Sequence, residues 1–243
     1  MKNLTITIFC FLSIALLGAG DNGDSTVRTD DLETWTIKKT TDFEVTGDGT
    51  AENWNLAEWM IIPQRRGKSL ETKAKILYSE SGIYFLFSCQ DEKVTASMEA
   101  DFMDLWKEDV VEVFLWPDET IPFYFEYEIS PLNYELPILI SNQEGDLLRW
   151  KPFHYEEDRK TRHATSIRGG IKESNASITS WTAEFYIPYK LLMPLKNIPP
   201  ISGSKWRANF YRVDYDGNKS VWSWKKTITN FHQYEKFGHL LFE

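Results

Sequence analysis

The sequence has few of the residues that build disulfide, zinc and phosphate sites. Its 243 residues include two cysteines, Cys10 and Cys89, and four histidines. Two cysteines are too few for a disulfide framework or a four-thiolate zinc site. The chain also lacks a phosphate-binding glycine loop, the G-x-S-x-G element of serine hydrolases and the H-E-x-x-H motif of zinc proteases. Enzymes that are defined by these motifs are therefore excluded.

Positive charge is also scarce. The chain has 27 Lys and Arg against 36 Asp and Glu, which gives a formal net charge of −9. Because nucleic-acid binding needs a basic face, we expect no nucleic-acid partner. Aromatic residues, in contrast, are abundant: 10 Trp, 11 Tyr and 15 Phe make up 15% of the chain. Buried β-strands and surfaces that stack on flat ligands both use such residues.

Long hydrophobic runs are absent beyond the first 20 residues, which have the pattern of a secretory signal peptide. Lys2 supplies the positive end, an apolar stretch follows, and small residues occupy 18–20. We predict a signal peptide at 1–20, no transmembrane segment after cleavage, and an exported protein that is periplasmic, cell-surface or secreted. A retained membrane anchor is the alternative. Cleavage leaves Cys89 alone in an apolar run, where we expect a buried, inert thiol.

The rest of the chain indicates one domain. We predict a flexible lead-in at 21–38 and a single β-domain at 39–243, because no linker, repeat or low-complexity tract divides it. Alternation of apolar and polar residues is the main pattern, at 73–79, 82–90, 109–116, 123–130, 180–188 and 205–215. Clean alternation is typical of antiparallel sheets. The predicted fold is therefore all-β: an antiparallel β-sandwich of immunoglobulin-like or jelly-roll type, with about eight to eleven strands.

Local signals refine this prediction. The residues at 80–82 indicate a hairpin between the first two strands. Segment 135–141 is apolar, but Pro137 makes it an edge strand at best, because proline cannot donate to the ladder. Helical periodicity is weak, and the best short candidates are 55–60 and 188–192.

Acidic side chains on the predicted strands are the first candidates for chemistry. They are Glu112, Glu126, Glu128 and Glu184. A pair of carboxyl groups can drive glycoside hydrolysis. Strand glutamates more often pair with cations across a sheet, and Arg207 and Arg212 are available as partners.

The turn at 46–53 is a candidate calcium site. Asp48 and Glu52 lie within it, and Asp91 follows a predicted strand. Carboxylate and carbonyl oxygens are the ligands that Ca²⁺ takes. The fixed spacing of an EF-hand loop is missing, and an ordinary turn explains the same residues.

Three tryptophans stand in polar segments. Trp106 lies between Asp104 and Lys107, and Trp222 and Trp224 share one face of the segment NKSVWSWKK if it is extended. The C–H faces of a sugar ring stack on indole, and neighbouring polar groups bond its hydroxyls. Each tryptophan taken alone favours a place in the core over a ligand platform, and the two sites together favour binding.

Six segments taken together resemble a known family. They are GDGTAENWNLAEW (47–59), LWKEDVVEVFLWPD (105–118), YFEYEISPLN (124–133), WTAEFYIPYKLL (181–192), WRANFYRVD (206–214) and FHQYEKFGHLLF (231–242). Their order is similar to that of the family 9 carbohydrate-binding modules, in particular the exported family 9-like proteins of Bacteroidetes-type bacteria. The resemblance covers about residues 40–243.

This resemblance implies a β-sandwich that holds the reducing end of a mono- or disaccharide between two tryptophans and carries structural Ca²⁺. The family pattern W-x-x-D-x-V-E matches 106–112, so the resemblance assigns stacking to Trp106 and sugar bonding to Glu112. It gives the second tryptophan as either Trp222 or Trp224. Glu126 stands about where sugar binders carry an arginine. Candidate replacement donors are Arg207, Arg212 and Lys225, and Asn209 is a further predicted ligand-binding residue.

Three functions follow from these observations. The first is a non-catalytic exported carbohydrate-binding protein that captures polysaccharide beside glycan-degrading enzymes and needs no cofactor, with Ca²⁺ as an option. The second is a haem-binding electron-transfer module, for which Met98, Met103 and His232 are the available axial ligands. The third is a glycoside hydrolase that uses two of Glu112, Glu126 and Glu184.

Overall fold

The computed structural model describes residues 33–144, 146–193 and 195–243. The predicted signal peptide and the lead-in up to residue 32 lie outside the described residues. Within them the protein is all-β, as predicted, with 14 strands. The strands are β1 (Thr34–Lys39), β2 (Met60–Ile61), β3 (Gln64–Arg66), β4 (Thr72–Tyr78), β5 (Gly82–Gln90), β6 (Val110–Trp116), β7 (Phe123–Ile129), β8 (Glu135–Gln143), β9 (Asp146–Pro152), β10 (Arg162–Arg168), β11 (Ser180–Pro188), β12 (Lys205–Asp214), β13 (Ser220–Ser223) and β14 (Gly238–Phe242).

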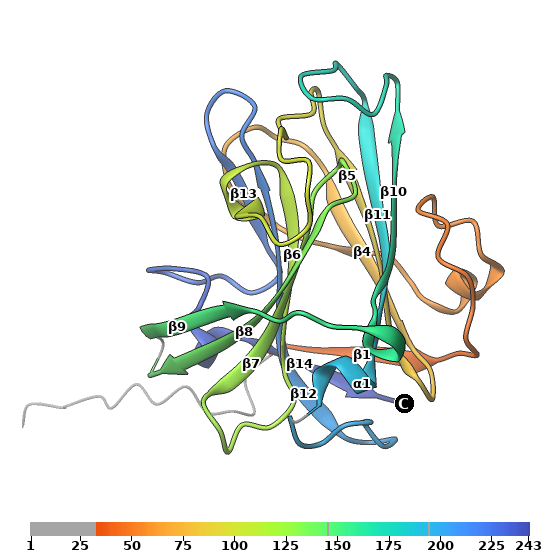
Figure 1. Ribbon diagram of the computed structural model, residues 1–243, viewed down its shortest axis with the longest axis vertical. Helices are drawn as coiled ribbons and strands as arrows, with labels where there is room; N and C mark the ends of the chain where they lie inside the picture. Colours follow the sequence, from red (N-terminus) through yellow and green to blue (C-terminus); the bar gives the residue numbers. More distant parts are fainter. Residues whose placement is uncertain (1–32, 145, 194) are drawn as a thin grey trace, which may run out of the picture. The chain divides into compact units, whose positions relative to one another are not determined.

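The strands form one continuous, curled sheet in the order β10-β11-β5-β4-β1-β14-β12-β6-β7-β8-β9. Strand β1 joins its two arms, because Thr34–Ile37 pair with β14 and Lys38–Lys39 pair with β4. Both pairings of β1 are parallel, and the other strand pairs of the described chain are antiparallel. Figure 1 shows one arm, with β4, β5, β10 and β11, facing the other, with β6, β7, β8 and β12. The predicted layered antiparallel fold is therefore confirmed, with β1 as its join.

The prediction of a flexible lead-in up to residue 38 is wrong for its last residues. Trp35 and Ile37 are buried, whereas Thr34 and Thr36 are exposed. This is the alternation of a half-buried strand. The segment looks polar in the sequence because its solvent-facing side chains are polar. Two buried apolar residues are too few to predict a strand at β1.

The main core lies between the two arms. From β11 it takes every second residue, Trp181, Ala183, Phe185 and Ile187, as the alternation predicts. β6 contributes Val111, Val113 and Leu115 in the same way. Cys89 is fully buried in this core, and burial raises the pKa of its thiol to about 12. The predicted burial of this thiol is therefore confirmed, and the raised pKa disfavours the reactive thiolate at neutral pH.

Pro137 does not restrict its strand to an edge. β8 lies between β7 and β9, so the edge-strand prediction is wrong. The Pro137 carbonyl accepts a hydrogen bond from the Phe153 N–H at 2.8 Å, just past the end of β9. In an antiparallel ladder the nitrogen and carbonyl of a residue face the same neighbour. The donor that proline lacks therefore faces the place where β9 ends, and the ladder with β7 is untouched.

Several local predictions are confirmed and others are corrected. The hairpin between β4 and β5 is present, and the short helix α1 (Tyr189–Leu192) follows β11. In place of a helix at 55–60, the chain forms a 3₁₀ turn, η2 (Glu52–Leu56). The strands missing from the prediction include β9 and β10, which are edge strands with mostly exposed or half-buried side chains. Such strands carry no clear hydrophobic period.

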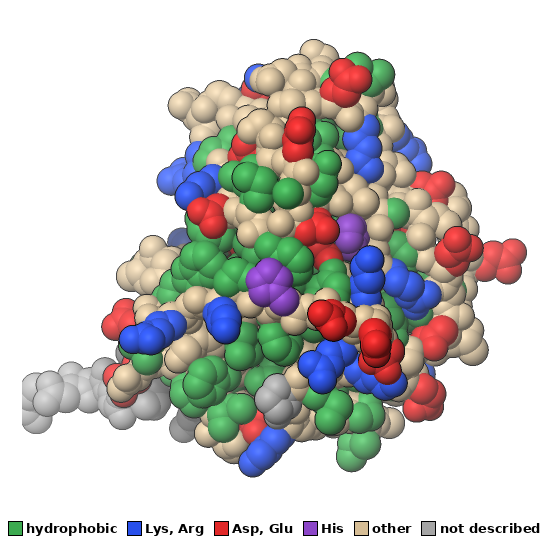
Figure 2. Space-filling view, viewed as in Figure 1, with side chains coloured by type: hydrophobic (Ala, Val, Ile, Leu, Met, Phe, Trp, Pro, Cys, Tyr) green, Lys and Arg blue, Asp and Glu red, His purple; other side chains and the backbone are tan. Residues whose placement is uncertain are grey.

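The two outer faces of the curled sheet are covered differently. The outer face of β4, β5 and β11 is capped by the chain's own segment 43–57, whose Phe43 ring stacks on Tyr84 at 4.1 Å. Trp54 is buried against the same face. The outer face of β12, β6, β7 and β8 carries a second apolar cluster and is only partly covered. Figure 2 shows hydrophobic side chains gathered between charged ones over the middle of the visible surface. An open site is therefore available on one arm.

Candidate functional site

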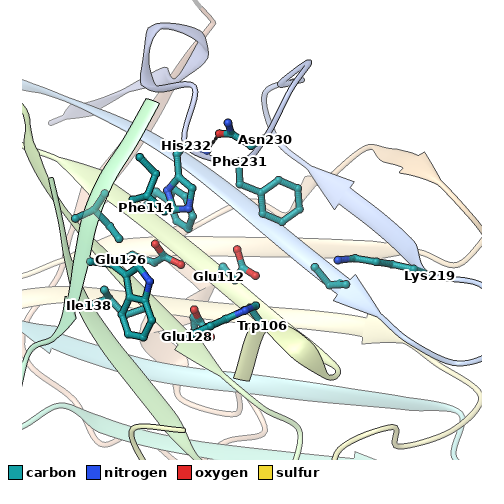
Figure 3. Close-up of a pocket in the computed structure, with 14 residues that line it drawn as sticks. Trp106, Glu112, Phe114, Glu126, Glu128, Ile138, Lys219, Asn230, Phe231 and His232 are labelled. Carbon is teal, nitrogen blue, oxygen red and sulfur yellow. Dashed lines mark hydrogen bonds between the residues drawn. The ribbon is translucent and has the colours of Figure 1, made fainter. Parts of the chain in front are cut away.

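A cavity of about 380 Å³ lies on the partly covered outer face (Figure 3). Its floor comes from strands β6, β7, β8 and β12, and its rim from the segments before β6, at β9, before β13 and before β14. The lining residues are Trp106, Glu112, Phe114, Glu126, Glu128, Ile138, Ile140, Leu147, Trp150, Val213, Lys219, Asn230, Phe231 and His232. Among the predicted site residues, the structure brings Trp106, Glu112 and Glu126 together here.

Three carboxyl groups form the polar part of the floor. Glu112 of β6 and Glu128 of β7 are directly opposite in the antiparallel ladder, and Glu126 lies two residues along on the same face. Their exposed fractions are 2% for Glu112, 4% for Glu126 and 0% for Glu128. Figure 3 shows the three carboxyl groups around one space. We call them the acidic floor.

Burial dominates the electrostatics of the acidic floor. It raises the pKa of Glu112 to about 8, against a smaller opposing effect from Lys219. The pKa of Glu126 is raised well above its ordinary value by burial and then by Glu112. Burial, followed by the neighbouring Glu126 and Glu112, does the same for Glu128. In the ligand-free protein these groups are therefore largely protonated at neutral pH.

Aromatic rings from separate segments form the rim. Trp106 lies on the 3₁₀ turn η3 (Leu105–Lys107) and is half-buried, and Trp150 of β9 is 41% exposed. Their ring centroids are 5.2 Å apart, edge to face. Phe231 and His232, before β14, approach from the opposite side (Figure 3). Indole and phenyl faces are therefore available beside a polar floor.

His232 is neutral at physiological pH. Burial lowers its pKa to about 4. The Tyr124 hydroxyl lies 2.6 Å from its Nδ1, and its carbonyl accepts a bond from Asn142 Nδ2 at 2.8 Å. These contacts fix the rim at this side of the cavity.

Asp109, the aspartate of the W-x-x-D-x-V-E pattern, holds the site without lining it. Its carboxyl oxygens accept hydrogen bonds from the Thr95 N–H at 2.6 Å and the Tyr215 N–H at 2.8 Å. The Tyr215 hydroxyl in turn donates to the Trp106 carbonyl at 2.7 Å. This chain of contacts fixes the position of Trp106 relative to strand β6.

The prediction of an exposed tryptophan at 222 or 224 is wrong. Trp222 is 0% exposed and Trp224 is 2% exposed, and both belong to the core between the arms. The Arg212 guanidinium lies 4.4 Å from the Trp222 ring centroid, and the Phe210 ring stacks on Trp224 at 5.3 Å. Neither indole has a free face for a ligand, and neither lines the cavity.

Arg207 and Asn209 lie on the same outer face as the acidic floor but do not reach it. Arg207 donates to the carbonyls of Phe237 and Tyr234 and to Glu119. Asn209 is fully buried; its Nδ2 donates to the Tyr211 hydroxyl and the Lys225 carbonyl, and its Oδ1 accepts from the Phe210 and Lys225 N–H groups.

Arg212 and Lys225 are not replacement donors either. Arg212 points to the core, where it pairs with Asp91 at 2.9 Å and Asp214 at 3.3 Å. Lys225 Nζ lies 2.9 Å from Glu33. The one Lys or Arg that lines the described cavity is therefore Lys219.

The three predicted calcium ligands do not come together. Asp48 and Glu52 are exposed in the segment over the outer face of β11, where Asp48 accepts from Thr46 and Thr50 in a tight turn. Asp91 lies between the arms and pairs with Arg212. Across the residues that the structure describes, no group of three or more His, Cys, Asp or Glu side chains is placed to hold a metal.

The structure brings only some of the proposed catalytic and haem-ligating residues together in the cavity. Glu184 lies on the outer face of the other arm, where it accepts from the Gly47 N–H at 2.7 Å and from Trp54 Nε1 at 2.8 Å. It anchors the covering segment and is separated from Glu112 and Glu126. Of the three proposed haem ligands, His232 lines the cavity, and Met98 and Met103 do not.

An open cavity that combines aromatic faces with a few buried polar groups is the form of a small-ligand binding site, here on an all-β module. The chain belongs to the family described as carbohydrate family 9 binding domain-like, which it matches over residues 45–243. The predicted family is therefore confirmed.

Solved structures share the fold. A Bacteroides uniformis protein, named as a predicted carbohydrate-binding protein, has a TM-score of 0.72 at 18% identity over 87% of this chain and 100% of its own. A family 9 module from Caldicellulosiruptor kristjanssonii, solved with cellotriose, has a TM-score of 0.61 at 14% identity, covering 87% of this chain and 94% of its own. The same module was also solved with glucose. At these identities the likeness establishes the fold.

A curated relative matches part of the chain. An "extracellular protein" of the fungus Arthroderma benhamiae is 26% identical over 149 residues. The match spans 59% of this chain and 63% of that protein. In the part of the chain that the structure describes, none of the helices has the length and apolar character to cross a membrane.

Part of the cavity lining was not predicted as a sugar site. Glu128 was a candidate for chemistry only, although it alternates on the same face as Glu126. Trp150, Lys219, Asn230 and Phe231 had no usable signal, since they lie on an exposed edge strand or in loops that only the folded sheet brings to one place.

Proposed function

We propose that this protein is an exported, non-catalytic carbohydrate-binding module that holds one saccharide ring in the cavity over the acidic floor. The observation that carries the proposal is the pairing of aromatic faces, Trp106 and Trp150, with buried carboxyl groups in one cavity of a family 9 fold. A sugar ring needs both kinds of surface, because it presents C–H faces and hydroxyl groups together.

The protonated carboxyl groups suit neutral hydroxyls. A protonated carboxyl group both donates and accepts hydrogen bonds, as a hydroxyl does. Glu112 and Glu126 can therefore bond adjacent hydroxyls of one ring without a buried charge. Trp106, which the family pattern assigns to stacking, lies at the edge of the same cavity. The unit that we propose for this cavity is a terminal one, such as a reducing end, as the family resemblance implies.

The family and the relatives support the proposed ligand class and location. Cellotriose and glucose occupy the Caldicellulosiruptor module that shares this fold, and the fungal relative is named extracellular. We place this protein outside the cytoplasm, where it captures oligo- or polysaccharide for breakdown by separate glycan-degrading enzymes.

Replacing Trp106 by Ala is expected to weaken saccharide binding at least about tenfold, because the ring loses its stacking surface. Titration calorimetry of the purified protein with glucose, cellobiose, xylobiose and longer oligosaccharides measures this. Trp59→Ala is the matched control, since Trp59 is 40% exposed and lies outside the cavity lining. Trp150→Ala is expected to weaken binding as well.

Two outcomes would overturn this proposal. The first is a folded protein that gives no saturable heat with any saccharide. The second is equal loss of binding in Trp59→Ala and Trp106→Ala. Chromatography of the sugars recovered after titration tests the hydrolase alternative, because shortened products that disappear in Glu112→Gln would establish cleavage.

A further inference from the structure

In the described structure no Lys or Arg side chain pairs with Glu126 or Glu128 of the acidic floor, and burial keeps these carboxyl groups neutral when no ligand is bound by raising their pKa values. Three carboxyl groups share one buried space, where Glu126 and Glu128 can hydrogen-bond to each other when one of them is protonated. In the described structure no other residue donates to Glu126 Oε2 or to either Glu128 carboxyl oxygen within ordinary hydrogen-bond geometry. Buried polar groups in folded proteins are nearly always partnered. Unsatisfied oxygens that face a cavity therefore indicate what a ligand supplies, namely hydrogen-bond donors.

The surrounding cations do not fill this role. Lys219 is exposed at the rim, where its Nζ donates to the Tyr215 hydroxyl at 3.0 Å and lies 4.8 Å from the Tyr215 ring centroid. His232 is neutral, and Arg207 and Arg212 are bonded elsewhere. The floor is left without a cation at the position of Glu126 and Glu128.

We infer that the cavity recognises a cationic amino sugar, a hexosamine unit whose amino group is free, through Glu126 and Glu128. This inference rests on the proposed carbohydrate-binding function and names its ligand class. A primary ammonium carries three N–H donors and no acceptor, which matches a floor of carboxyl oxygens that lack donors. Charge-assisted hydrogen bonds of this kind are stronger than those of neutral pairs.

The rest of the cavity fits a sugar that carries this ammonium better than a bare metal ion. In the described structure no three carboxyl groups converge on a single metal position. The floor is spread across two strands, and the rings of Trp106, Trp150 and Phe231 border it. Aromatic faces suit the C–H faces of a ring and also attract an ammonium group.

Binding of a cation has a signature that binding of a neutral sugar lacks. An ammonium group stabilises the ionised form of the neighbouring carboxyl groups and so favours release of their protons. Amino-sugar binding therefore releases protons to the buffer, and glucose binding does not. Added salt weakens the charged interaction in particular.

Calorimetry of the purified protein tests the inference with three matched ligand pairs. Glucosamine is compared with glucose, its β-1,4-linked disaccharide with cellobiose, and glucosamine with N-acetylglucosamine, whose nitrogen carries no charge. Each titration is run in two buffers of different ionisation enthalpy, which reports protons released. We expect the amino sugars to bind at least about tenfold more tightly than their partners.

Variants assign this preference to the acidic floor. Glu126→Gln/Glu128→Gln is expected to abolish both the preference and the proton release. Glu128→Gln alone is expected to weaken both and to keep binding of the neutral sugars, because their hydroxyl groups are assigned to Glu112 and Glu126. Glu173→Gln, at an exposed carboxyl group outside the cavity, is expected to keep both. Circular dichroism of each variant checks the fold.

The outcomes distinguish failure of the amino-sugar inference from failure of the carbohydrate-binding proposal. Equal or tighter binding of the neutral sugars would overturn the amino-sugar inference and leave the carbohydrate-binding proposal intact. No binding of any sugar would overturn both. CaCl₂ alone is titrated as well, and saturable heat from Ca²⁺ that is lost in Glu126→Gln/Glu128→Gln would overturn the inference in favour of a metal.

Discussion

Replacing Arg212 by Met is expected to lower the free energy of unfolding by about 3–5 kcal/mol, because it leaves buried carboxylates without their counter-ion. Arg212, Asp91 and Asp214 all have fully buried side chains. The guanidinium of Arg212 also donates to the Gln90 carbonyl at 2.6 Å and to Thr72 Oγ1 at 3.1 Å. These contacts join β12 to strands of the facing arm, so their loss affects the packing of both layers.

Urea unfolding at pH 7 measures this effect, and an exposed ion pair provides the control. Lys190 pairs with Asp158, and both side chains are 64% exposed. Lys190→Met should therefore cost less than about 1 kcal/mol. The double variant Arg212→Met/Asp91→Asn should recover part of the loss, because one of the two uncompensated charges is gone. A cost for Arg212→Met as small as that of Lys190→Met would show that this buried cluster does not stabilise the fold.

The free energy of unfolding is expected to fall as the pH rises from 6.5 to 8. Burial, followed by the neighbouring carboxyl groups, raises the pKa values of Glu126 and Glu128 well above their ordinary range in the folded chain. The unfolded chain ionises near the ordinary value of about 4.3. Between these values the folded state binds more protons than the unfolded state, so the free energy of unfolding decreases with pH. Each such group contributes up to about 1.4 kcal/mol per pH unit.

The choice of pH window removes an opposing contribution. Burial lowers the pKa values of His232 and His239, and these groups make stability rise with pH only below about 6.5. Above that pH the opposing contribution of the histidines fades, and the raised carboxyl groups, including Asp109 with a pKa of about 8, dominate the decrease in stability.

Chemical denaturation at pH 6.5, 7.25 and 8 measures the slope. Glu126→Gln/Glu128→Gln should have a clearly flatter dependence than the parent, since an amide does not ionise. Glu173→Gln, whose side chain is exposed, should follow the parent. Parallel slopes for the parent and the double variant would contradict the raised pKa values of the acidic floor.

The interior strands of the sheet were the part of the fold that could be predicted from the sequence. β5, β11 and β12 combine strong period-two alternation with bulky apolar residues, and their predicted bounds agree with the structure to within one residue. Glu126 was placed on the correct face by the same alternation. Edge strands such as β9 were not predicted, because a strand that is exposed on both faces has no hydrophobic period.

The tryptophans show the limit of local composition as a guide. Trp222 and Trp224 stand among Lys, Asn and Ser in the chain, and this polarity suggested exposure. Their burial depends on Arg212 and Phe210, which pack on their rings from a neighbouring strand. The rim of the cavity could not be predicted from local composition either. Trp150 and Phe231 are far apart in the chain and are brought to one cavity only by the folded sheet.

A crystal structure with a bound sugar tests the central claim most directly. Crystals are soaked with glucosamine in one case and cellobiose in another, because the claim concerns the position of the ring and not its charge. We expect a ring in contact with Trp106, with its polar groups within hydrogen-bond distance of Glu112 and Glu126. A sugar bound elsewhere, for example at the exposed Trp59, with the cavity holding only water, would contradict it.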